Sequence, residues 1–244
     1  FMRNITPERA SSFSSSNTRM NEGLKNYMVY VYQNMSLALF ISGFVALMFS
    51  QIPALMAVIH GTPLGFIIAL APLGLAFYFG FKIKTMDLKT AQILFWVFAA
   101  LMGASLSSIF LIYPGESIAR AFFITAGTFL AMSIYGYTTK TDLTKMGSLM
   151  IMGLIGIIIA SLVNLFLKSS GLNFAISILS VIIFVGLTAY DTQKIKDLYY
   201  SLENSNIEAG MAKKIAIMGA LSLYMDFINL FLAILRFVGD RRND

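Results

Sequence analysis

The sequence contains no cysteine and a single histidine, His60, among its 244 residues. The lack of cysteine excludes disulfides, zinc–thiolate sites, iron–sulfur clusters and thiol catalysis. One histidine is also too few for a histidine-based metal site or a haem. Charged residues are equally scarce, because they make up 12% of the chain, against about 25% in an average soluble domain. This deficit argues against a soluble globule and indicates a membrane protein.

Long apolar stretches take the place of the missing charge. We identify seven, each close to the roughly 20 residues that a helix needs to cross a bilayer. The connections between them leave no room for a separate soluble domain. The predicted fold is therefore an all-α integral membrane protein with seven transmembrane helices at 26–239, after a disordered cytoplasmic tail at 1–25 and before a short charged tail at 240–244. The predicted spans are Tyr27–Ser50, Leu64–Phe81, Ala91–Tyr113, Ile118–Tyr137, Gly147–Leu167, Leu172–Ile195 and Ile215–Val238.

The basic residues predict the orientation of these spans. With a cytoplasmic amino terminus, thirteen of the eighteen lysines and arginines fall on the cytoplasmic side, as the positive-inside rule requires. Arg236, Arg241 and Arg242 at the carboxy terminus contradict the rule locally, so a re-entrant last segment stays open beside a full crossing. Because the charges lie between apolar runs and do not form one basic patch, no nucleic-acid partner is expected.

Two acidic residues lie inside predicted spans, Asp191 in the sixth and Asp226 in the seventh. A charged side chain at the centre of a spanning helix costs roughly 2.5 to 3.5 kcal/mol, so such carboxyls are rare and usually functional. Helical periodicity places each on a polar stripe, and the two antiparallel helices would then meet along a polar seam. The predicted seam residues besides the two aspartates are Ser177, Ser180, Thr188, Ser222 and Asn229.

The chemistry of an intramembrane carboxyl pair suggests a sensor. Two carboxyls that are forced together cannot both ionise easily, so they tend to share a proton. When ionised they form a hard oxygen site, which suits transient binding of calcium. Protons and calcium would then compete for Asp191 and Asp226, while no resident cofactor is expected. The alternative is that these polar groups only hydrogen-bond the two helices, with Asp191 near the interface and paired to Lys194.

At these residues the sequence resembles the transmembrane Bax inhibitor motif family. Ala189–Lys196 and Leu221–Phe231 look like its two hallmark helices, and Thr139–Leu143 resembles its loop between helices four and five. The similarity extends from about Tyr27 to Val238. Further segments resemble the bacterial YccA-type branch, namely Gln92–Trp96 and Phe122–Thr125.

The resemblance implies seven helices, the last enclosed by the other six, in the bacterial inner membrane. It also implies a calcium-permeable leak governed by the aspartate pair, onto which Asp191 and Asp226 map by position. In some members an arginine near the cytoplasmic end of helix two latches one aspartate. This chain has no arginine there, and Lys82 is the nearest substitute. The polar stretch between helices six and seven, around Tyr199 to Lys214, is also longer than in compact members.

Two other function classes compete with a pH-sensitive calcium leak. A regulatory protein without transport is one, since bacterial members are thought to engage membrane-anchored ATP-dependent proteases of the FtsH type, and the polar tail at 1–25 is a candidate handle. An intramembrane aspartyl protease is the other. Presenilin-type enzymes carry Gly-x-Gly-Asp at the second aspartate, whereas this chain has bulky residues from Leu223 to Met225, which argue against close approach of a substrate backbone. We therefore predict that the protein is not an enzyme.

Overall fold

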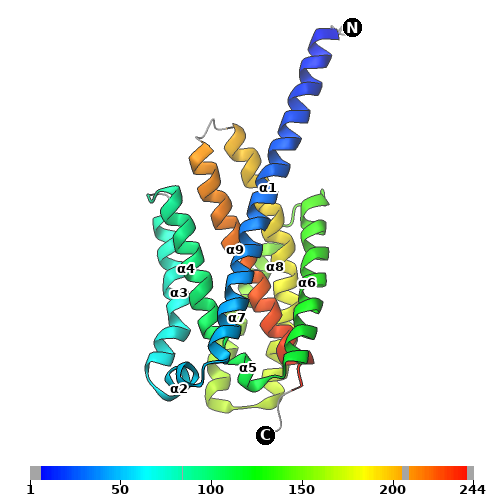
Figure 1. The fold of residues 1–244 in the computed structure, drawn as a ribbon. Helices are drawn as coiled ribbons and strands as arrows, with labels where there is room; N and C mark the ends of the chain where they lie inside the picture. The colour runs from blue at the N-terminus through cyan, green and yellow to red at the C-terminus, as the bar shows by residue number, and fades with distance from the viewer. Residues whose placement is uncertain (1–6, 84, 205–208, 241–244) are drawn as a thin grey trace.

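The computed structural model describes residues 7–83, 85–204 and 209–240, and these residues form only helices and their connections (Figure 1). Seven helical segments are long and apolar enough to cross a membrane. The predicted fold class, an all-α protein with seven such helices, is therefore confirmed. The helices are α1 (Pro7–Ser50), α2 (Pro53–Gly61), α3 (Leu64–Lys82), α4 (Leu88–Leu106), α5 (Ile109–Ile112), α6 (Gly115–Thr138), α7 (Thr144–Leu167), α8 (Ser170–Asn204) and α9 (Ala209–Val238).

The described helices agree closely with the predicted spans, because long apolar runs determine both. Two short helices, α2 and α5, were not predicted. α2 begins at Pro53, which occupies the first helical position, where its missing N–H costs nothing.

α4 begins at Leu88 after Asp87, whose side chain accepts a hydrogen bond from the Thr90 backbone N–H. The hydrogen bonds from Thr90 hold the pKa of the exposed Asp87 carboxyl below its ordinary value.

Helix α9 lies at the centre of the bundle. In its most apolar stretch 61% of the residues are buried, more than in any other of the seven spans. It packs against α1, α4, α6 and α8. The outer helices α3 and α7 make their main contacts with α4 and α8 instead. Enclosure of the last helix by all six others is therefore not confirmed, although four of them surround it.

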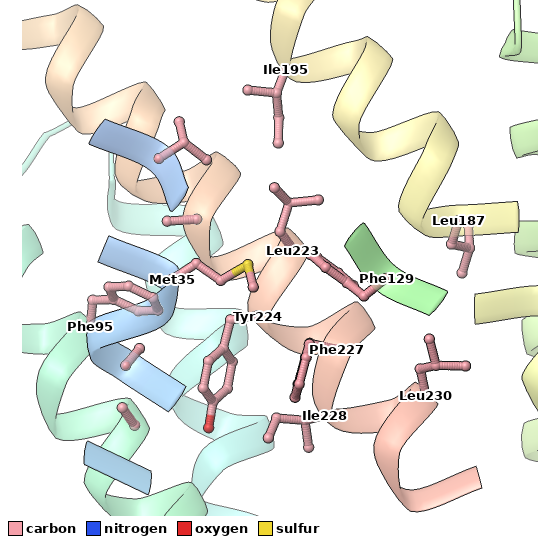
Figure 2. Packing of buried hydrophobic residues seen from close by; sticks show 14 of the residues in the cluster. Met35, Phe95, Phe129, Leu187, Ile195, Leu223, Tyr224, Phe227, Ile228 and Leu230 are labelled. Atoms are coloured by element: carbon pink, nitrogen blue, oxygen red, sulfur yellow. The ribbon is translucent and has the colours of Figure 1, made fainter. Parts of the chain in front are cut away.

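Aromatic side chains of α9 form the middle of the core. Figure 2 shows Tyr224 and Phe227 projecting from α9, with Phe95 of α4 and Phe129 of α6 beside them. The Tyr224 ring stands edge-on to Phe95 at 6.1 Å between centroids, and Phe227 stands edge-on to Phe129 at 5.4 Å. The Tyr224 hydroxyl is buried and lies 2.6 Å from Ser42 Oγ of α1. This hydrogen bond ties the central helix to the first span at its apolar mid-level.

Both polar segments that were expected to lie outside the helices are largely helical. Residues 1–6 of the predicted tail are outside the described part, but 7–25 belong to α1. Leu24 is already buried, so packing of α1 against the bundle begins before the predicted boundary. Between the sixth and seventh spans, α8 continues to Asn204 and α9 begins at Ala209. The longer polar stretch therefore extends two helices instead of forming a long loop.

The last helix crosses the whole bundle without a break. The two ends of the chain lie at opposite ends of the molecule in Figure 1. Just after α9, the Asp240 backbone N–H donates to Ser117 Oγ over 3.2 Å, and the Asp240 carboxylate lies 3.6 Å from Arg120. These contacts place the end of α9 beside the start of α6, so the re-entrant alternative is wrong. Residues 241–244 of the predicted charged tail are outside the described part.

Candidate functional site

Asp226 is a buried acid near the middle of α9. The residue is only 5% exposed. One of its oxygens, Oδ2, has no hydrogen-bond partner among the described residues. Leaving a buried acceptor unpaired costs roughly 1 to 3 kcal/mol, and more when the group is charged. Asp226 is therefore a costly residue for the fold, as its position in the sequence predicted.

Asp191 lies opposite Asp226 because α8 and α9 run antiparallel and approach closely. At Gly219 an added Cβ would lie 3.0 Å from Ile195 Cγ1, so the missing side chain lets the two helices meet there. From this contact Asp191 is four residues and Asp226 seven residues further into the bundle, about 6 and 10 Å along the helix axes. The structure therefore places the two acids on helices that pack against each other, at neighbouring levels. That they act as a pair stays a prediction.

Lys194 is a cation close to Asp191 on the same helix. It lies one turn along α8 from Asp191, with its Nζ 5.6 Å from the centre of the Tyr190 ring. No ion pair within 4 Å joins Lys194 to either carboxyl among the described residues. The predicted latch, Lys82, is instead exposed at the end of α3.

The predicted seam residues divide into two groups. Ser177 and Thr188 are buried, but each hydroxyl donates to a carbonyl of its own helix, Asn173 at 2.9 Å and Phe184 at 2.7 Å. Ser222 is exposed and takes no part in the buried contact between α8 and α9. The remaining two predicted residues, Ser180 and Asn229, line the same cavity.

This cavity, of about 320 Å³, lies between α7, α8 and α9. Ser180 and Asn229 face it together with Ser161 and Arg236. Asn229 is one turn from Asp226, so the cavity begins close to the buried carboxyl and extends toward the carboxy-terminal end of the bundle. Ser161 was not predicted, because the periodicity argument compared only the sixth and seventh spans. Its polar side chain within the mainly apolar second half of α7 was the available signal.

Gln193 is a second residue whose role the periodicity did not show. Its side chain accepts a hydrogen bond from the Leu143 backbone N–H and donates one to the Thr141 carbonyl, each over 2.8 Å. These bonds tie α8 to the connection between α6 and α7. Gln193 is two residues from Asp191, so the helix that carries the acid is anchored at this end of the bundle.

A family model described as inhibitor of apoptosis-promoting Bax1 matches residues 24–243. The chain belongs to this family. Among its relatives, an uncharacterized protein of Rickettsia prowazekii is 52% identical over 230 residues, which cover 94% of this chain and 96% of that protein. The inner membrane protein YbhL of Escherichia coli is 44% identical over 231 residues, which cover 94% and 97% of the two chains. The assignment to the YccA-type branch stays a prediction.

In this Bax inhibitor family protein the acids do not form a preformed metal cage. No group of three or more histidine, cysteine, aspartate or glutamate side chains comes together within the described ranges. Calcium normally takes six to eight oxygen ligands. Asp191 and Asp226 alone supply up to four, so water or backbone carbonyls would have to complete the shell.

Proposed function

We propose that this member of the Bax inhibitor family is a pH-sensitive calcium leak of the bacterial inner membrane, gated by Asp191 and Asp226. The observation that carries the proposal is the buried Asp226, whose Oδ2 lacks a partner among the described residues, on the helix that packs against the one carrying Asp191. Fold stability does not explain such an arrangement, because an apolar residue would fill the position at lower cost. The seven apolar helices and the similarity to the inner membrane protein YbhL support the inner membrane as its place.

The gate would work through the packing of α8 against α9. When the pair holds a proton, the two helices carry little repulsion and stay in contact. Loss of that proton sets two carboxylates against each other in apolar surroundings, which favours separation of the helices or entry of a cation. Lys194 is close enough to compete with calcium for the ionised pair. The cavity that Asn229 and Ser180 line offers a route from the pair toward the carboxy-terminal end.

Calcium flux into proteoliposomes tests this proposal. We expect the wild type to pass calcium at a rate that changes across a pH series from 5 to 8. Asp226→Asn and Asp191→Asn should each remove most of that pH dependence, because an amide cannot exchange the proton. Asp197→Asn is the matched control, since Asp197 is exposed on α8 and lies outside the pair. Unchanged flux and pH profile in Asp226→Asn would falsify the gating role.

A regulatory contact with a membrane-anchored ATP-dependent protease is a second candidate function. The observation that favours it is the amino-terminal part of α1, which extends beyond the ends of the other helices in Figure 1. A projecting helix is accessible to a partner without disturbing the bundle.

Deletion of residues 1–19 separates this candidate from the leak. The deletion stops short of Leu24, which is buried, so the bundle should still fold. We expect co-purification with a membrane protease to be lost while calcium flux persists. If the shortened protein still co-purifies with the protease, the contact lies elsewhere and the start of α1 is not the binding segment.

A further inference from the structure

A large groove runs between α1 and α6, and residues of these two helices line it. Its volume is about 780 Å³. Two of the lining residues contact the helices behind the groove: Tyr32 Oη of α1 lies 3.3 Å from Thr192 Oγ1 of α8, and Phe129 of α6 packs on Phe227 of α9. The walls are open to the surroundings, since Leu130 is 61% and Ile134 56% exposed. This is a lateral opening toward the membrane, not an enclosed cavity.

The groove has a polar end and an apolar end. Lys25 of α1 and Tyr137 of α6 lie at the end where the chain enters the bundle, while Met35 and Phe129 lie deeper. From Lys25 to Ser36, the last lining residue on α1, there are eleven residues, or about 16 Å of helix. The hydrocarbon core of a bilayer is about 30 Å thick. The groove is therefore about as deep as one leaflet.

The groove carries one positive charge at its mouth, that of Lys25, the charged residue among its lining residues. A second cavity, of about 580 Å³, adjoins it at Tyr137 and is lined by Lys140 and Lys196 together with Asp142 and Asp197. Lys196 Nζ donates to the Tyr137 carbonyl over 2.9 Å. The mouth also belongs to the end of the bundle where most basic residues of the sequence gather, which favours a negatively charged head group.

We propose that an anionic phospholipid occupies the groove between α1 and α6, with its phosphate at Lys25 and one acyl chain along the apolar walls. A cation at the leaflet surface and an apolar channel one leaflet deep match the two halves of such a lipid. A zwitterionic lipid fills the channel equally well but gains less at the mouth. If a second copy of the chain occupied the groove, one of its apolar helices would have to cover Lys25. Burial of that charge against an apolar helix disfavours a dimer at this place.

Native mass spectrometry of the full-length protein with added lipid tests the proposal. We expect phosphatidylglycerol to remain bound one to one when phosphatidylcholine has dissociated. Lys25→Gln should weaken phosphatidylglycerol retention about fivefold, the effect expected for one lysine near an anionic surface. Lys89→Gln is the matched control, because Lys89 is exposed at the start of α4 and does not line the groove. It should bind as the wild type does.

A blocking variant tests the acyl channel separately. Ser36→Trp places a ring at the deep end of the groove, where Ser36 is exposed. It should reduce retention of both lipids without changing the unfolding temperature in detergent. Equal retention of the two lipids by the wild type, or no difference between Lys25→Gln and Lys89→Gln, would overturn the proposal. A dimer peak that Ser36→Trp removes would assign the groove to a second copy and would also overturn it.

Discussion

Gly136→Ala is expected to destabilise the protein by about 1 to 3 kcal/mol or more, the usual cost of overpacking a filled interface. Gly136 is the point at which α6 meets α8. A Cβ atom there would overlap the Ala189 carbonyl oxygen and would lie 2.9 Å from its carbonyl carbon. Because the obstacle is backbone, no side-chain rotation relieves it. The helices must move apart, and α8 carries Asp191.

Gly127→Ala is the matched control on the same helix. No atom lies within 4 Å of a Cβ added at Gly127. Replacing a helical glycine with alanine in open space should leave stability unchanged or raise it by up to about 1 kcal/mol. Thermal unfolding of both variants in the same detergent measures the difference. Equal unfolding temperatures for the two variants would show that α6 and α8 do not pack as closely as described.

Asp226→Leu is expected to have the opposite effect on stability, raising it by about 1 to 4 kcal/mol. The substitution removes a buried carboxyl with an unpartnered oxygen and puts a side chain of similar size among apolar neighbours. If the proposed leak is gated by Asp226, the substitution should also abolish calcium flux. Gain of stability with loss of activity is the pattern expected when a functional residue is held at a cost to the fold.

The measurements are thermal unfolding in detergent and flux in proteoliposomes. Asp197→Leu serves as the control, since that side chain is exposed on α8 and should change neither quantity much. If Asp226→Leu unfolds at a lower temperature than the wild type, the Asp226 carboxyl stabilises the fold. The claim that this carboxyl lowers stability is then wrong. If it keeps its flux, the path for calcium does not depend on Asp226.

Much of the fold could be predicted from the sequence because membrane insertion leaves a strong local signal. Each span is a predominantly apolar run, and the described helices begin and end within a few residues of most predicted limits. The short helices α2 and α5 carry no comparable signal. The helical extensions of α1 and α8 were missed since their residues are polar, and polarity indicates where the membrane ends but not where a helix does.

The candidate site could be predicted only in part, because the sequence shows polar residues within apolar spans but not which helices face each other. Asp191 and Asp226 are visible because a charge within an apolar run is conspicuous. Periodicity then tells which face of a helix a residue occupies, but not which helix lies opposite. Ser222 shares a stripe with Asp226 and is nevertheless exposed, and Lys82 is exposed at the end of α3. Lys194, which the alternative interpretation of the sequence paired with Asp191, lies one turn from it on α8.

The central place of α9 has a consequence for biosynthesis. Of the seven spans it is the last to be synthesised, yet it has the largest share of buried residues. Until Val238 has left the ribosome, α1, α4, α6 and α8 lack the partner around which they pack. We therefore expect the earlier spans to be inserted in the membrane before they can pack around α9. Chains truncated before α9 should be inserted but unassembled, and so exposed to the quality-control proteases of the membrane.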